Sequence, residues 1–166
     1  MAILEVGINI GPKNLVEIKY YSASDNIINP DIRARFLSGI ESYITEVYGD
    51  SINVISLSNF QIICYYKTIQ MPGDDEDNTQ PLLSYAITDK NVKPNLVKRH
   101  LKEIISDFMT QYTPKDIFLR ESKYFVNFQP HINDILGDLK LTTEDRIGLV
   151  VRKKKKEEKV ESKEEE

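Results

Sequence analysis

The stretch AILEVGINIGPKNLVEIKYY, residues 2–21, decides the fold that the sequence predicts. It holds two apolar runs rich in β-branched residues, and the Gly-Pro-Lys-Asn segment at 11–14 between them is typical of a turn. In the second run Val16, Ile18 and Tyr20 share one face, while the residues between them are mostly polar, as in a strand with one face in water. The connection of four residues predicts an antiparallel hairpin whose second strand lies at the edge of a sheet.

Residues 30–48 predict an amphipathic helix after this hairpin. Pro30 suits the first helical position, with Asn29 as N-cap, and Gly49 suits a left-handed C-cap. A glycine inside a helix costs roughly 1 kcal/mol relative to alanine, so we expect Gly39 to let the helix axis approach the sheet closely. A wide apolar stripe follows helical spacing and is expected to lie on the sheet: Ile32, Phe36, Leu37, Ile40, Tyr43, Ile44, Val47 and Tyr48.

The rest of the chain predicts three more strands and two more helices. Strand patterns occupy residues 51–57, 60–70 and 82–89, the first two joined around Ser58 and Asn59. Helical patterns occupy residues 94–112 and a segment that starts at Pro130. The strand at 60–70 is apolar on both of its faces, so we expect both to be covered. The segment 115–127 is ambiguous and is consistent with a short helical turn and a loop.

This order predicts one α+β domain over residues 1–141. Its five-stranded, mostly antiparallel sheet follows the order strand, strand, helix, three strands, helix, helix, with one helix on one face and two on the other. Residues 142–151 form a short extension, in which RIGLVV fits either a short strand or the start of a helix. Apolar residues nearly vanish in residues 152–166, so we expect a charged, disordered tail there.

Charge and composition exclude several classes of protein. The last fifteen residues hold seven basic and six acidic side chains, which leaves the remainder at about −5, whereas a nucleic-acid module needs a basic face. The single cysteine, Cys64, lies in an apolar run and is expected to be a buried thiol. No segment is apolar enough to cross a membrane and the first residues lack the basic start of a signal peptide, so we expect a cytoplasmic protein.

The sequence shows no recognisable catalytic, cofactor or metal-binding pattern. His100 and His131 lie in predicted helices without an acid or a nucleophile at local spacing. The acidic loop at 74–77 lacks the alternating ligands of a calcium loop, and the phosphate-binding and hydrolase motifs are missing. We therefore expect no catalysis, no metal and no cofactor, with an enzyme built from distant residues as an alternative.

The order and lengths of the predicted elements resemble the longin domain, the fold of longin-type SNARE N-terminal domains, small adaptor subunits and TRAPP-type tethering subunits. The hairpin at 2–21, the helix at 30–49, the meander at 52–88 and the helix after Pro94 carry this resemblance, which is one of topology. It implies the strand order 2-1-5-4-3 and a non-catalytic platform that binds or regulates a small GTPase or joins a vesicle-trafficking or tethering complex. Partners of such domains often use the groove between the first helix and the third strand.

Two departures from the related families narrow this resemblance. A longin SNARE continues into a long coiled coil, whereas the apolar pattern here stops at Val151, so the chain resembles a stand-alone longin-like protein or a subunit. Roadblock domains usually begin with a helix, whereas this chain begins with a hairpin. A roadblock-like, dimerising scaffold subunit remains an alternative.

Two features of the sequence are typical of a protein-binding surface. Residues 51–60 contain no Lys, Glu, Pro or Asp that would block pairing of an edge strand with another chain. The helix at 30–48 carries mixed charges on its predicted outer side. The partner is expected to be a small GTPase, another longin or roadblock subunit, or a second copy, with at most peripheral membrane contact through the basic run at 152–156. The predicted partner-binding residues are Ile52, Val54, Ile55, Leu57, Arg33, Arg35 and Glu41.

Overall fold

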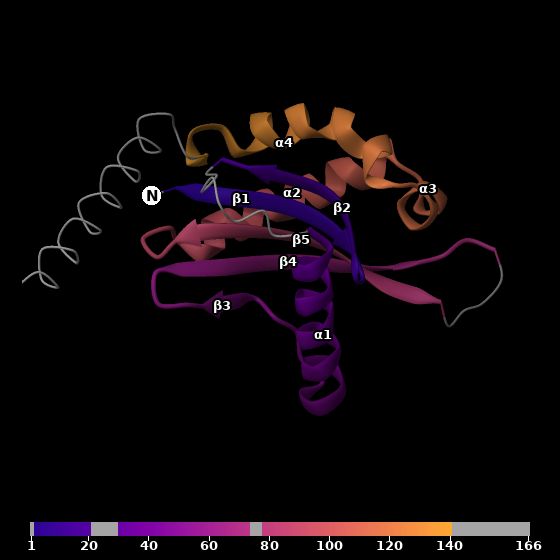
Figure 1. The fold of residues 1–166 in the computed structure, drawn as a ribbon, viewed down its shortest axis with the longest axis horizontal. Coiled ribbons are helices and arrows are strands. Elements are labelled where there is room, and N and C mark those ends of the chain that lie inside the picture. Colours follow the sequence, from indigo (N-terminus) through magenta and orange to yellow (C-terminus); the bar gives the residue numbers. More distant parts are fainter. Residues whose placement is uncertain (1, 21–29, 74–77, 141–166) are drawn as a thin grey trace, which may run out of the picture.

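Five strands and four α-helices make up the part of the chain that this computed structural model describes, namely residues 2–20, 30–73 and 78–140 (Figure 1). The strands are β1 (Ile3–Ile10), β2 (Lys13–Lys19), β3 (Val54–Ser56), β4 (Phe60–Gln70) and β5 (Thr79–Asp89). The helices are α1 (Pro30–Tyr48), α2 (Pro94–Gln111), α3 (Pro114–Leu119) and α4 (Gln129–Leu136), with two 3-10 turns, η1 (Ser122–Phe128) and η2 (Gly137–Leu139). The predictions for Asn29, the acidic loop at 74–77 and residues 142–166 concern positions outside these ranges.

The five strands form one sheet in the order β2-β1-β5-β4-β3, and each neighbouring pair is antiparallel. The predicted α+β class, antiparallel sheet and strand order are confirmed, and β2 and β3 form the two edges. The longest pair is β4 with β5, which runs from Phe60 opposite Asp89 to Gln70 opposite Thr79. Both faces of β4 are covered as predicted, because Ile63 and Cys64 point to opposite faces and both are buried.

One face of the sheet carries α2, α3 and α4 and contains the main core (Figure 1). Helix α2 buries Val97, Leu101, Ile104, Ile105 and Phe108. The ring of Phe108 packs against Phe125 and Phe128 of η1, with ring centroids 5.3 and 5.0 Å apart. These aromatic contacts order the stretch that was ambiguous in the sequence.

Helix α3 is one helix more than the two that were predicted for this face. Pro114 occupies its first turn, and the Thr113 hydroxyl accepts a hydrogen bond from the Asp116 backbone N–H at 3.2 Å. Ile117 is fully buried in the main core and holds the helix against it. Six residues are too few for a periodic pattern to stand out, so capping and burial decide this element.

Helix α1 lies alone on the other face and touches the sheet through a small contact. Only Ala34 and Leu37 are buried in it, and Leu37 packs with Ile62, Cys64 and Tyr85. Figure 1 shows the C-terminal part of α1 projecting beyond the sheet. The prediction that the whole apolar stripe lies on the sheet is therefore wrong, and five of its residues are 53–66% exposed: Ile32, Phe36, Tyr43, Val47 and Tyr48.

The sheet offers α1 little apolar surface, which explains why most of the apolar stripe of α1 stays exposed. Strands β1 and β2 present polar side chains toward α1, among them Glu5 and Glu17, which form ion pairs with Arg33 of the helix. Among the described residues, the apolar side chains that meet α1 on this face come from β4, β5, β3 and Ile52 just before β3. A helix that buries only this half of the face has no contact for the rest of its stripe.

Gly39 does not serve a close approach, contrary to the expectation from the sequence. A Cβ atom built on Gly39 would meet nothing within 4 Å. The close approach is at Gly7 in β1, where a Cβ would lie 2.5 Å from the hydroxyl oxygen of Tyr85, the residue opposite it in β5. The C-cap prediction is confirmed, because Gly49 has a φ of 62° and its N–H donates to the carbonyl of Thr45.

Strand β3 is shorter than the strand predicted over residues 51–57. Three residues pair with β4, from Val54 opposite Ile63 to Ser56 opposite Gln61. Backbone hydrogen bonds from Leu57 N–H to the Phe60 carbonyl and from Cys64 N–H to the Asn53 carbonyl continue the contact on each side. In the described parts of the chain no helix is long and apolar enough to cross a membrane.

Candidate functional site

The edge of the sheet at β3 is the first part of the candidate interaction site. Strand β3 pairs with β4 on one side and ends the sheet on the other. Val54 and Leu57 are 38% and 48% exposed, and Phe60 beside them is 41% exposed. Ile52 and Ile55 are half-buried and pack instead on the cluster around Leu37. The four predicted strand residues therefore divide into an outward pair and an inward pair.

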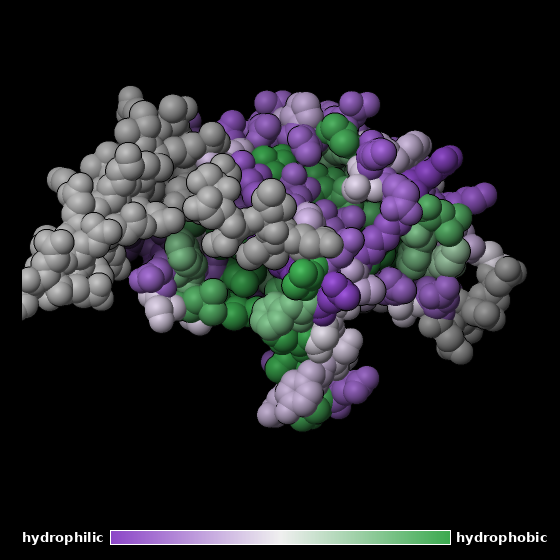
Figure 2. Space-filling view, in the orientation of Figure 1, coloured by the Kyte–Doolittle hydropathy of each residue, from purple (hydrophilic) through white to green (hydrophobic). Residues whose placement is uncertain are grey.

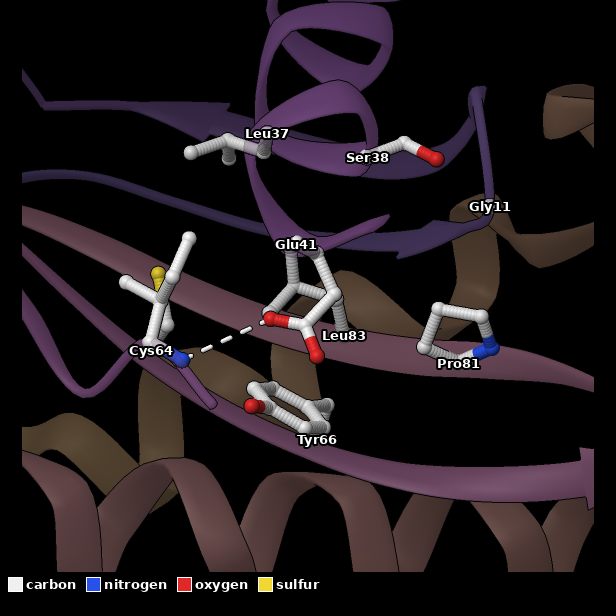
Figure 3. A pocket seen from close by; sticks show the side chains of 9 residues that line it. Gly11, Leu37, Ser38, Glu41, Cys64, Tyr66, Pro81 and Leu83 are labelled. Atoms are coloured by element: carbon white, nitrogen blue, oxygen red, sulfur yellow. Dashed lines mark hydrogen bonds between the residues drawn. The ribbon is translucent and has the colours of Figure 1, made fainter. Parts of the chain in front are cut away.

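A groove between α1 and the sheet is the second part of the site (Figure 3). The groove is shallow, and the space between its lining residues, counted together with the open solvent at its mouth, is about 330 Å³. The lining is mostly apolar and comes from α1, the turn between β1 and β2, the segment before β3, and strands β4 and β5: Gly11, Leu37, Ser38, Glu41, Ile52, Cys64, Tyr66, Pro81 and Leu83. The groove thus reaches from the buried contact of α1 to the edge of the sheet.

Glu41 joins α1 to the segment before β3. Its carboxylate accepts hydrogen bonds from the Ile52 backbone N–H at 3.5 Å, drawn as the dashed line in Figure 3, and from the Thr45 hydroxyl at 3.2 Å. Burial, together with the nearby charge of Glu41, raises the pKa of the Tyr66 hydroxyl above its usual range. Glu41, predicted to lie on the outer side of the helix, is half-buried at the groove instead.

The Cys64 thiol in the groove is not an activated nucleophile. Burial, with a smaller contribution from the charge of Glu41, raises the pKa of the Cys64 thiol to about 12. A thiol with this pKa is almost entirely protonated at neutral pH, and the thiolate is the reactive form. The prediction that Cys64 is a buried core thiol is confirmed.

Arg33 points toward the sheet and not outward as predicted. Its side chain is 11% exposed, and Nη1 lies 2.7 Å from Glu5 Oε2 and 2.9 Å from Glu17 Oε1. The same nitrogen donates to the Tyr85 hydroxyl at 3.3 Å. Burial raises the pKa of Glu5 although the charge of Arg33 opposes this shift. Arg33 therefore compensates two carboxylates beneath α1 and is not available to a partner.

Arg35 stays exposed, as predicted, and so does Glu46. Of the seven predicted partner-binding residues, three are exposed: Arg35, Val54 and Leu57. The exposed apolar residues of α1 were missed because the sequence indicated that they pack on the sheet. The width of the apolar stripe could have indicated these exposed residues, because the stripe is wider than the surface that a helix buries on one face of a small sheet.

The two histidines lie away from the groove. His100 Nδ1 is 2.8 Å from the carbonyl of Leu96 in its own helix, and His131 stacks on Phe128 with ring centroids 5.5 Å apart. Within residues 2–20, 30–73 and 78–140 no group of three His, Cys, Asp or Glu could hold a metal ion.

Comparison of the sequence with models of known protein families gives no match, and comparison with curated proteins gives none either. The functional assignment therefore rests on the geometry of β3 and α1.

Proposed function

We propose that this protein is a non-catalytic interaction platform with a longin-like fold, and that its partner docks on the edge of β3 and the adjoining face of α1. The observation that carries the proposal is an edge strand without charged residues, whose outward side chains Val54 and Leu57 are apolar and exposed. Such an edge offers unpaired backbone groups to a second chain, and native proteins usually protect it with Lys, Pro or a covering loop.

Strand addition is the binding mode that suits this edge. A partner strand beside β3 would form backbone hydrogen bonds, while its side chains would cover Val54, Leu57 and Phe60. The groove beside α1 would take a side chain from the partner at the point where Glu41 holds the segment before β3. Backbone pairing would supply affinity, and the groove would supply specificity.

The class of partner follows from the resemblance stated above. The strand order β2-β1-β5-β4-β3, with α1 alone on one face, supports a longin-like fold. A small GTPase, or another longin or roadblock subunit of a trafficking or tethering complex, is therefore the proposed partner. The exposed apolar face of α1 also favours the second candidate, a roadblock-like scaffold that dimerises.

Replacing Val54 by lysine tests the platform. The side chain is exposed, so the fold should persist, whereas a buried charge in the interface should weaken capture of the partner by about tenfold or more. The measurement is affinity capture with the full chain, identification of co-purifying small GTPases or longin subunits, and titration of the purified partner.

Val126→Lys is the matched control for this substitution. Val126 is 51% exposed on η1, which contacts β2 at the other edge of the sheet from β3, so this variant should bind like the parent. Circular dichroism should show both variants folded. Equal capture by the Val54→Lys variant and the parent, or a parent that captures neither class of protein, would refute the proposal.

A further inference from the structure

Helix α1 carries an exposed apolar surface on which no element of the described ranges packs. We define the α1 stripe as Ile32, Phe36, Gly39, Ile40, Tyr43 and Val47, which lie within about 100° of one another at 3.6 residues per turn. Its four large side chains other than Ile40 are 53–58% exposed. Figure 2 shows green and pale side chains along the part of α1 that projects from the sheet. Contiguous apolar surface of this kind marks an interaction site.

The α1 stripe is symmetric about the middle of the helix. Its positions pair as 32 with 47, 36 with 43 and 39 with 40, and each pair is equally far from the midpoint of Gly39 and Ile40. A second copy of α1 running in the opposite direction therefore presents the same pattern. It would place Phe36 against Tyr43 of the second copy, and Ile32 against Val47 of the second copy. This is the self-complementarity that a two-fold interface requires.

We propose that α1 packs antiparallel against α1 of a second copy of this chain, about a two-fold axis near Gly39. The proposal rests on the platform function above and deepens it, since it assigns the α1 face to a second copy and leaves the β3 edge to the other partner. Gly39 then has a role that the single chain does not provide. Without a side chain at the crossing point, and with no atom within 4 Å of the place of its Cβ, the two backbones can approach closely.

The charges beside the α1 stripe are complementary in this arrangement. Arg35 and Glu46 are exposed on the same flank and lie eleven residues apart, about 16 Å along the axis, so they cannot meet within one helix. In the antiparallel pair Arg35 is level with position 44 of the second copy, about 3 Å along the axis from Glu46 of the second copy. Two symmetric ion pairs result, whereas a parallel two-fold pair would leave this flank of the two copies on opposite sides of the contact, with no such ion pair.

The available area suits a weak, dissociable dimer. With about 200 Å² for an aromatic side chain and about 150 Å² for Val or Ile, the exposed parts of the four large residues amount to about 400 Å² on each copy. Two copies would bury about 800 Å², which is in the range of weak, transient interfaces. We therefore expect the dimer to form in a concentration-dependent manner.

Analytical ultracentrifugation of the full chain from micromolar to millimolar concentration tests this proposal. The parent should move from the monomer mass to twice that mass as its concentration rises. Val47→Glu should abolish the dimer, while Val126→Glu should not, although the two valines are 55% and 51% exposed. Gly39→Leu should also abolish the dimer without lowering the melting temperature of the monomer, because nothing packs against Gly39.

A charge exchange identifies the contact itself. Arg35→Glu and Glu46→Arg should each weaken association by about fivefold or more, since each turns two attractive pairs into repulsive ones. The double variant should restore it. Both residues are exposed, so this arm remains informative if Val47→Glu fails to fold. A parent that is monomeric throughout, equal effects of the two Val→Glu changes, or no restoration in the double variant would overturn the proposal. If no α1 dimer forms but Val54→Lys loses the partner, only the α1 pair is refuted. If the α1 dimer forms but Val54→Lys captures the partner like the parent, only the β3 platform is refuted.

Discussion

Gly7 is the position at which the fold excludes a side chain. The Tyr85 ring lies across it, and Tyr85 is fully buried, so the ring cannot swing away from an added methyl group. Gly7→Ala should therefore lower the free energy of unfolding by roughly 1–3 kcal/mol through overpacking. Urea unfolding of dilute protein measures this change. Gly39→Ala is the matched control and should raise the free energy of unfolding by about 0.5–1 kcal/mol, because alanine favours a helix and nothing crowds the site. Similar effects of the two changes would contradict the assignment.

Glu5 makes stability depend on pH. Burial raises its pKa above the ordinary value of 4.5, so the native state binds more protons than the unfolded chain in that range. The stability contributed by protonated Glu5 is complete below pH 4.5 and is lost as the pH rises through the native pKa. Glu5→Gln removes this loss while Arg33 keeps Glu17 as its partner. The variant should therefore gain on the parent between pH 4.5 and neutrality, as urea unfolding at each pH measures. A gain confined to acid pH would contradict the sign.

At the scale of elements, α1 and α2 have similar lengths but bury very different numbers of residues. Helix α1 buries two residues in nineteen, whereas α2 buries five in eighteen. Amides of the C-terminal half of α1 should therefore exchange with solvent faster than those of α2, because local opening of that half exposes little apolar surface. Hydrogen exchange of the dilute chain, followed by mass spectrometry or NMR, measures this difference. At high concentration the difference should shrink if α1 pairs with a second copy. Equal protection of both helices in the monomer would show that α1 is held more firmly than its contacts indicate.

For the whole molecule, the single cysteine reports global unfolding. Cys64 belongs to β4, and its side chain packs with Leu37 of α1 and is 2% exposed. Burial raises the pKa of its thiol to about 12. A thiol reagent should leave the native protein unmodified at neutral pH and should react fully in urea, since the thiolate forms only when the residue meets water. The labelled fraction should follow the unfolding curve from circular dichroism, as two-state unfolding requires. Labelling well before that transition would indicate that α1 detaches while the rest stays folded.

The sequence by itself determined the elements of this protein and much of their order. Alternation and β-branched runs located the strands, and the resemblance carried by the hairpin and helices implied the strand order. Apolar residues on both faces of β4 correctly indicated a covered central strand, and Gly49 marked the end of α1. These features depend on residues close together in the chain, whose spacing is directly visible.

Only the tertiary structure decided which side of α1 meets the sheet, and with it the candidate site. The helix spacing showed one wide stripe, but the contact surface is set by β1 and β2, which turn Glu5 and Glu17 toward the helix and draw Arg33 inward. The same chain segment therefore keeps Leu37 in the core and leaves Phe36 exposed. A helix buries the part of its apolar surface for which an apolar counterpart is within reach, and that counterpart comes from residues far away in the sequence.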